Sequence, residues 1–98
     1  MKILAIEKET HPATSNDYAP HLKDEAAQVW ALYQAGVIRE IYFRQDRPEA
    51  VLVLECADDE EARQALSTLP LVQERLITFD LIPLRPYPGL ARLWEEAS

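Results

Sequence analysis

The sequence holds one arrangement in which a histidine could act as a base. His21 lies three residues after Tyr18 and four before Glu25, so on a helix the three side chains would share one region of the surface. Histidine titrates near neutral pH, and Glu25 could orient His21 as a base if that surface borders a pocket. The alternative is an ordinary surface hydrogen bond, because the start of a helix is normally accessible to water.

Two carboxylates, Glu7 and Glu55, fall within segments that are otherwise apolar. A carboxylate in such a place costs free energy unless it is paired or lies near a pocket. Arg39 would pair with Glu55 if the two lie opposite each other in a hairpin, either as a cross-strand ion pair or as part of a site. Glu7 has no such partner, and a glutamic acid whose pKa is raised in an apolar cavity is a credible general base.

Three aromatic residues could complete a site for a small carbonyl compound. Tyr33 and Tyr42 could donate a hydrogen bond to an enolate oxygen, and Trp30 could form an apolar wall. As ordinary core aromatics they need no function. Arg39 is a further candidate for holding negative charge.

Other kinds of site have little support. The two histidines lack the i,i+4 spacing of a metal pair, and Cys56 is the one cysteine. The two glycines, Gly36 and Gly89, are too far apart to form a phosphate loop. We therefore predict no metal and no cofactor.

The composition predicts one soluble domain, residues 1–98, with a C-terminal arm at residues 84–98. A net charge of -7 without a basic cluster argues against binding to nucleic acid or to an anionic membrane. The apolar start, residues 1–6, is too short for a signal peptide or a membrane span. We expect a cytoplasmic protein.

The elements that must position these residues follow from the sequence pattern. Residues 2–8 read as a strand. A helix should follow, with capping residues at 14–17, Pro20 in its first turn, an inward stripe and a stop at Gly36. The expected stripe comprises Tyr18, Leu22, Ala26, Val29 and Tyr33.

Residues 37–57 read as a β-hairpin around the polar link 45–49, with Phe43 opposite Val51 and Arg39 opposite Glu55. A second helix should start at Asp58, which has capping-box spacing with Glu61, and end at Pro70. Residues 76–84 read as the last strand, and a proline-rich arm with a short helix at its end completes the chain.

The order strand, helix, strand, strand, helix, strand predicts an α+β, ferredoxin-like βαββαβ fold with a four-stranded antiparallel sheet. Two helices cover one face of such a sheet, yet the expected central strands, residues 3–6 and 51–54, are apolar on both faces. A second copy of the chain is the simplest cover for the other face, and the arm could clasp it. We expect a homodimer or a higher homo-oligomer.

Several details resemble the muconolactone isomerase family of the dimeric α+β barrel superfamily. They are Asp24-Glu25 and Gly36 in the first helix, Arg39 after it, Leu69-Pro70-Leu71 after the second helix, and the proline-rich tail. The resemblance implies a pocket between the sheet and its helices. It also implies a cofactor-free reaction that moves a proton along a small unsaturated lactone, with Asp24, Glu25 and Arg39 as the positions carried over.

Two hypotheses of function follow. The first is a small cofactor-free isomerase that acts on a small unsaturated lactone or another largely apolar carbonyl compound. Its predicted catalytic residues are His21, Glu25, Arg39 and Glu55, and its predicted substrate-binding residues are Glu7, Trp30, Tyr33 and Tyr42. The second is a non-catalytic homodimeric module that binds a small ligand or stabilises a partner enzyme, and it predicts a packed or narrow cavity.

Overall fold

The structure, a computed structural model, describes residues 1–95. Its four strands are β1 (Lys2–Glu9), β2 (Ile38–Phe43), β3 (Ala50–Glu55) and β4 (Ile77–Leu84). They form one antiparallel sheet in the order β2-β3-β1-β4, so that β1 and β3 are central. The predicted α+β fold with a four-stranded antiparallel sheet is confirmed.

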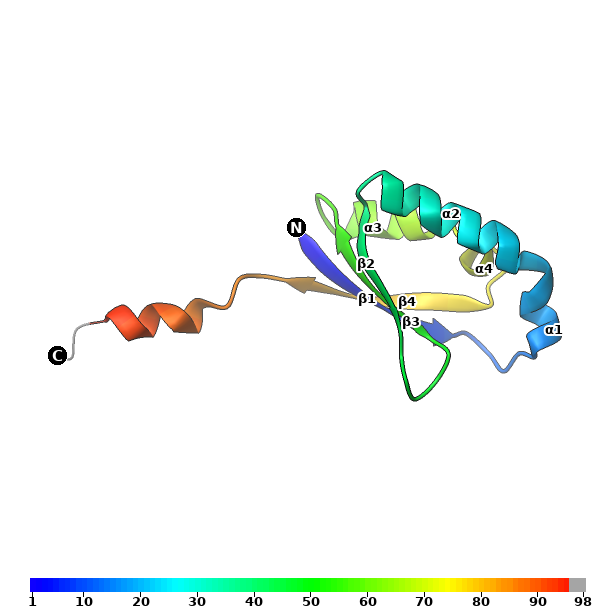
Figure 1. Cartoon of the computed structure of the whole chain (residues 1–98), viewed down its shortest axis with the longest axis horizontal. Helices are drawn as coiled ribbons and strands as arrows, with labels where there is room; N and C mark the ends of the chain where they lie inside the picture. Colours follow the sequence, from blue (N-terminus) through cyan, green and yellow to red (C-terminus); the bar gives the residue numbers. More distant parts are fainter. Residues whose placement is uncertain (96–98) are drawn as a thin grey trace.

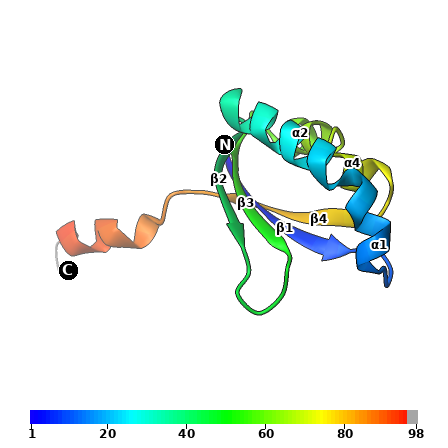
Figure 2. The same ribbon diagram turned by 45° about the vertical axis from the view of Figure 1, so that its right-hand side comes forward.

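The helical segments are α1 (Ser15–Tyr18), the 3-10 helix η1 (Ala19–His21), α2 (Leu22–Gln34), α3 (Asp59–Leu66), α4 (Pro70–Gln73) and the 3-10 helix η2 (Pro88–Trp94). Helices α2, α3 and α4 lie on one face of the sheet (Figures 1 and 2). None of the helices within residues 1–95 has the length and the run of apolar residues that a bilayer span requires.

The first predicted helix is interrupted at Pro20. The chain forms α1, a 3-10 turn and then α2 instead of one continuous helix, because proline lacks the backbone N–H and its ring crowds the preceding turn. The expected stripe is buried only in part, since Tyr18 and Val29 pack against the core. Leu32 is the buried residue of α2, whereas Leu22 is 52% exposed and Tyr33 is 46% exposed.

The predicted hairpin register is wrong by one residue. Phe43 lies opposite Ala50 and Tyr42 opposite Val51. A β-bulge at Arg39 shifts the pairing, since Ile38 lies opposite Leu54 but Glu40 lies opposite Val53. The extra residue reverses the side on which later side chains of β2 lie. Phe43 therefore lies on the helix side of the sheet.

The core lies between the sheet and helices α2 and α3, with Leu32 of α2 among its buried residues. Ile3 and Ala5 of β1 and Leu54 of β3 are fully buried against Ala62 and Leu66 of α3. Helix α3 begins as predicted, because Asp58 Oδ1 accepts a hydrogen bond from the Glu61 backbone N–H at 2.9 Å. Its predicted end is wrong. The helix stops at Leu66, and Pro70 starts α4 at a position where the missing N–H costs nothing.

The face of the sheet away from the helices is apolar at its centre. Side chains alternate between the two faces along a strand. Because Ile3 and Ala5 are buried on the helix side, Leu4 between them lies on the other face. This open face carries Leu4, Ile6, Val51, Val53 and Ile82. Ile82 is 43% exposed, and the other four are half-buried.

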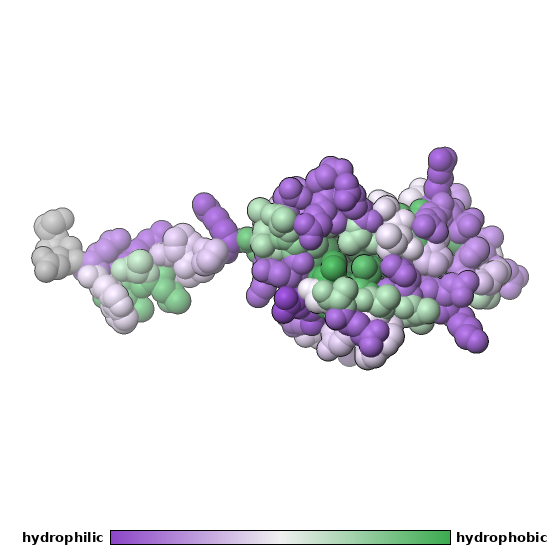
Figure 3. All heavy atoms as spheres, turned by 90° about the horizontal axis from the view of Figure 1, so that it is seen from above, coloured by the Kyte–Doolittle hydropathy of each residue, from purple (hydrophilic) through white to green (hydrophobic). Residues whose placement is uncertain are grey.

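The C-terminal arm extends away from the rest of the molecule (Figure 1). The molecule measures 63 × 29 × 19 Å and its radius of gyration is 16.7 Å, whereas a compact chain of this length has about 13 Å. Hydrophobic side chains gather along one side of the arm (Figure 3). Leu90 and Leu93 of the arm are 66% and 68% exposed. The last three residues of the predicted arm, 96–98, lie outside the described residues.

Two helices end in the same Schellman motif, but with different residues at the position that requires a positive φ. At the end of α2, Gly36 has φ 80°, and the Val37 N–H donates to the Leu32 carbonyl at 3.0 Å. At the end of α4, Arg75 has φ 59°, and the Leu76 N–H donates to the Leu71 carbonyl at 3.0 Å. Only glycine adopts this backbone conformation without a steric cost.

We therefore expect substitutions at these two positions to have opposite effects on the free energy of unfolding. Gly36→Ala should lower it by about 1–2 kcal/mol, because alanine is strained in the left-handed region. Arg75→Gly should raise it by up to about 1 kcal/mol, since the relief of strain exceeds the entropy that glycine adds to the unfolded chain. Urea unfolding followed by circular dichroism measures both. Two effects of the same sign would contradict the motif.

Candidate active site

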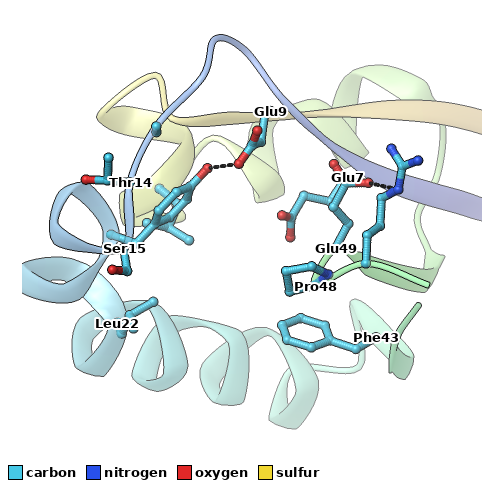
Figure 4. A pocket seen from close by; sticks show the side chains of 12 residues that line it. Glu7, Glu9, Thr14, Ser15, Leu22, Phe43, Pro48 and Glu49 are labelled. Atoms are coloured by element: carbon cyan, nitrogen blue, oxygen red, sulfur yellow. Dashed lines mark hydrogen bonds and ion pairs between the residues drawn. The ribbon is translucent and has the colours of Figure 1, made fainter. Parts of the chain in front are cut away.

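A pocket of about 640 Å³ lies at the end of the molecule where β1 finishes and α1 begins. It is bounded by the last residues of β1, by α1 and the first turn of α2, and by the link of the hairpin. Its lining residues are Glu7, Glu9, Ala13, Thr14, Ser15, Tyr18, Leu22, Phe43, Arg47, Pro48, Glu49 and Leu71. Figure 4 shows Glu7 and Glu9 across the pocket from Leu22 and Phe43. Carboxylates thus face an apolar wall.

Glu7 is a half-buried carboxylate of this pocket, on the helix side of β1. Its Oε1 accepts a hydrogen bond from the Ala50 backbone N–H at 3.1 Å, which fixes the side chain against β3. Burial raises the pKa of Glu7 above its ordinary value of 4.5, the Ala50 N–H opposes the rise, and the nearby charges of Glu49, Glu25 and Glu9 add to it. A fixed carboxyl group with a raised pKa suits a general base.

Tyr18, at the end of α1, lies against the second carboxylate. Its hydroxyl donates to Glu9 Oε1 at 3.1 Å. Burial, this hydrogen bond and the charge of Glu9 raise the pKa of Tyr18 to about 12. The phenol therefore stays protonated at neutral pH and keeps its proton for donation.

Glu25 and His21 lie behind the pocket. Glu25 Oε1 accepts from the backbone N–H of Leu71, a lining residue, at 2.9 Å, and burial raises the pKa of Glu25. The charge of His21 acts in the opposite direction on the pKa of Glu25. Among the described residues, however, no hydrogen bond joins them. The proposed His21–Glu25 pairing therefore stays a prediction.

The hairpin link carries an ion-pair network at the rim of the pocket. Arg44 donates to both oxygens of Asp46, from Nε at 2.9 Å and from Nη2 at 2.7 Å. Arg44 Nη1 and Arg47 Nε lie 3.6 and 3.7 Å from Glu49 Oε1. These contacts stiffen the link, three residues of which line the pocket.

Arg39 and Glu55 lie at the other end of the sheet and do not pair. The bulge turns Arg39 toward the helix terminus, where its Nε donates to the Gly36 carbonyl at 2.7 Å. Glu55 lies opposite Lys2 and is 3.5 Å from the amino group of Met1. Glu7 lies five positions after Lys2 in β1, which is about 17 Å along a strand. The structure therefore places both residues away from the pocket.

The three predicted aromatic residues also lie outside the pocket lining. Trp30 and Tyr33 stack on each other at 5.7 Å between ring centroids, on the outer side of α2, and are 58% and 46% exposed. Tyr42 lies on the open face of the sheet, where its hydroxyl donates to Glu40 Oε1 at 2.7 Å. Of the eight residues predicted for the site, Glu7 lines the pocket, and Glu25 and His21 lie next to it.

The sequence analysis missed Glu9, Phe43 and Glu49 as pocket residues. Phe43 was paired with Val51 instead of Ala50 because the bulge could not be seen, and Glu49 was treated as part of a polar link. Glu9 is the last residue of β1, directly after the predicted strand 2–8, and it lies two residues after Glu7 and hence on the same side, a spacing that could have indicated it. Residues 1–95 contain no group of three acidic, histidine or cysteine side chains placed to hold a metal ion.

The chain was compared with known proteins by sequence and by fold. A search of curated proteins finds no match. Among solved structures, a crystal structure of muconolactone isomerase aligns with a TM-score of 0.74 over 91% of this chain and 93% of that chain, at 16% sequence identity. This likeness confirms the fold.

The sequence model of the family described as muconolactone delta-isomerase matches residues 4–89, which includes the whole sheet except its first two residues and all residues that line the pocket. The match confirms the resemblance inferred from Asp24-Glu25, Gly36 and the Leu69-Pro70-Leu71 segment. This chain belongs to the muconolactone delta-isomerase family.

Proposed function

We propose that the protein is an isomerase that moves a proton along a small unsaturated lactone or a related carbonyl compound bound in the 640 Å³ pocket. The observation that carries this proposal is Glu7, a half-buried carboxylate on the pocket wall whose pKa burial raises. Family membership supports the class of reaction. The reaction needs no cofactor, because a carboxyl group can accept a proton and return it.

Glu7 is the proposed base. Its Oε1 is held by the Ala50 N–H, and Oε2 takes part in no hydrogen bond between the described residues. The Glu7 carboxylate removes a proton from the carbon next to the substrate carbonyl, and the electron pair of that C–H bond moves into a dienolate. The same carboxyl group then returns the proton to the far carbon of the conjugated system. The two proton transfers together conserve all atoms and electrons, so the reaction requires no further reagent.

Tyr18 and Arg47 are the proposed stabilisers of the dienolate oxygen. Tyr18 is protonated at neutral pH and lines the pocket, although its hydroxyl must turn from Glu9 to the ligand. Arg47 contributes positive charge from the hairpin link. Leu22 and Phe43 give the opposite wall an apolar surface on which the carbon skeleton of the substrate can pack.

The competing hypothesis was a non-catalytic module with a packed or narrow cavity. The volume of the pocket and the pKa shift of Glu7 count against that hypothesis.

Exchange with solvent deuterium tests the proposal directly. In D₂O, the protein should catalyse conversion of a small unsaturated lactone to its conjugated isomer, and deuterium should enter the far carbon of the conjugated system wherever the proton on Glu7 exchanges with solvent before its return. Proton NMR follows both changes. A protein that binds such lactones but catalyses neither exchange nor isomerisation would be a binding module, and the proposal would be wrong.

We also propose that the protein is a homodimer or a higher homo-oligomer in the cytoplasm. The apolar open face and the exposed Leu90 and Leu93 of the arm support self-association, because monomers rarely expose so much contiguous apolar surface. The free thiol of Cys56, which is 4% exposed, suits a reducing compartment.

A further inference from the structure

We infer that Glu49 is a positioning residue of the pocket, which holds the Arg47 side chain in place beside the proposed base, Glu7. The inference rests on the proposed function, because it concerns how that same site is organised. Its basis is the way in which the hairpin link connects these two side chains to each other.

Glu49 is the most buried member of the ion-pair network at the rim. Its side chain is 13% exposed, whereas those of Arg44, Asp46 and Arg47 are 35%, 58% and 58% exposed. Its Oε1 lies 3.6 Å from Arg44 Nη1 and 3.7 Å from Arg47 Nε. A largely buried carboxylate has few positions open to it, whereas an exposed arginine has many rotamers. Glu49 is therefore the fixed partner, and Arg47 is the side chain that is held.

The main chain around Glu49 is fixed as well. The Arg44 N–H donates to the Glu49 carbonyl at 2.9 Å, and the Glu49 N–H donates to the Arg47 carbonyl at 2.8 Å. The next residue, Ala50, begins β3 and donates its N–H to Glu7 Oε1 at 3.1 Å. Two consecutive residues thus hold the two functional groups. Glu7 and Glu49 both line the pocket, as Figure 4 shows.

The ion pair leaves Arg47 able to bind a ligand. Arg44 already holds Asp46 through two hydrogen bonds, of 2.9 and 2.7 Å, and Glu49 divides its charge between the two arginines. Asp46 and Glu49 both approach Arg47 at its Nε, and within residues 1–95 the Nη atoms of Arg47 donate no hydrogen bond. Because arginine presents its N–H donors in a planar fork, the Nη donors remain for the dienolate oxygen. Glu49 orients this fork without occupying it.

Glu49 also acts on the base through its charge. Among the charged groups that raise the pKa of Glu7, Glu49 has the largest effect, ahead of Glu25 and Glu9. A negative charge nearby favours the protonated form of a carboxyl group. Removing the charge of Glu49 should therefore lower the pKa of Glu7 and, at the same time, release Arg47. These two effects give the test two separate readouts.

Steady-state kinetics of Glu49→Gln and Arg47→Ala, alone and combined, test the inference with the lactone that the D₂O experiment identifies. Arg47→Ala should lower kcat by about 10- to 100-fold with little change in KM, since it removes a donor to the developing oxyanion. Glu49→Gln keeps the shape of the side chain but loses the ion pair, and should lower kcat by about 5- to 30-fold. In the double variant, kcat should stay within about two-fold of that of Arg47→Ala, because Glu49 acts through Arg47.

Nuclear magnetic resonance follows the two side chains independently of catalysis. In ¹⁵N-labelled protein, hydrogen exchange of the Arg47 Nε–H with water should be at least about three-fold faster in Glu49→Gln than in wild type. Carbon-13 spectra of the Glu7 carboxyl should give a titration midpoint above 4.5 in wild type and a lower one in Glu49→Gln. Glu49→Asp keeps the charge but draws it back by one methylene group. It should release Arg47 while the Glu7 midpoint stays near its wild-type value.

Glu60→Gln is the matched control, because it makes the same change of charge at an exposed position of α3, outside the pocket lining. It should leave kcat, the Arg47 Nε–H exchange and the Glu7 midpoint at their wild-type values. Unchanged Arg47 Nε–H exchange in Glu49→Gln and Glu49→Asp, or losses of kcat that multiply in the double variant, would overturn the inference. A wild-type protein that does not isomerise lactones would overturn the proposed function, and the Arg47 Nε–H exchange would then decide alone whether Glu49 positions Arg47.

Discussion

Glu7→Gln should lower kcat/KM for isomerisation by a factor of about 10² to 10⁴, the usual contribution of a positioned general base. The substitution removes the site that accepts the proton but keeps an oxygen that can accept the Ala50 N–H. Initial rates measured with the lactone identified by deuterium exchange would test the expectation. A wild-type rate in Glu7→Gln would remove Glu7 from the mechanism.

The same variant should not be less stable than wild type. Because burial raises the pKa of Glu7 above 4.5, the folded protein binds this proton more tightly than the unfolded chain does. The contribution of Glu7 to stability is therefore present below pH 4.5 and is lost as pH rises through the folded pKa. Glutamine carries no charge to bury, so at pH 7 the free energy of unfolding should stay equal or rise. Loss of activity with loss of stability would indicate misfolding instead.

The pH dependence of kcat/KM should reflect the ionisation of Glu7. The ionised form of Glu7 is active, so activity should fall on acidification with a midpoint above 4.5. Glu9→Gln removes one of the charges that raise this pKa, and the midpoint should move to lower pH. An unchanged midpoint would mean that another residue controls the acidic limb.

The fold could be predicted from the sequence because its signals are local and repeated. Runs of β-branched and other apolar residues mark the strands, Asp58 marks the start of α3, and the continuous apolar pattern of residues 3–6 and 51–54 identifies the central strands. Errors occurred where one residue changes the geometry. Pro20 interrupts a helix that the spacing of apolar residues predicts to be continuous. The bulge at Arg39 has no recognisable signature in the residue types around it.

The bulge explains most of what the sequence did not reveal about the site. A shift of one residue moves Phe43 into the pocket and Tyr42 out to the open face, and it separates Arg39 from Glu55. Glu7 was identified because its argument did not depend on register: a carboxylate in a central strand without a partner is costly wherever the hairpin lies. The prediction based on a residue's environment, that of Glu7, was therefore more reliable than the prediction based on an expected contact, that between Arg39 and Glu55.

A charge introduced at the centre of the open face should dissociate the proposed dimer. Leu4 lies between Val53 of β3 and Ile82 of β4, so Leu4→Glu would bury an unpaired carboxylate in the interface. We expect multi-angle light scattering to give twice 11.2 kDa, or a multiple of it, for wild type and 11.2 kDa for Leu4→Glu. Gln64→Glu, which adds the same charge at an exposed position of α3, is the control and should keep the wild-type mass.

The C-terminal arm allows a second, independent test of the proposed dimer. If Leu90 and Leu93 contact a second copy, removal of residues 86–98 should weaken the dimer without unfolding the sheet, because the arm packs on little of its own chain (Figure 1). Leu4→Glu and the truncation should then each lower the mass while the far-ultraviolet circular dichroism of the sheet and helices is kept. A wild-type protein that is monomeric at every concentration tested would mean that the open face is covered by something other than this chain.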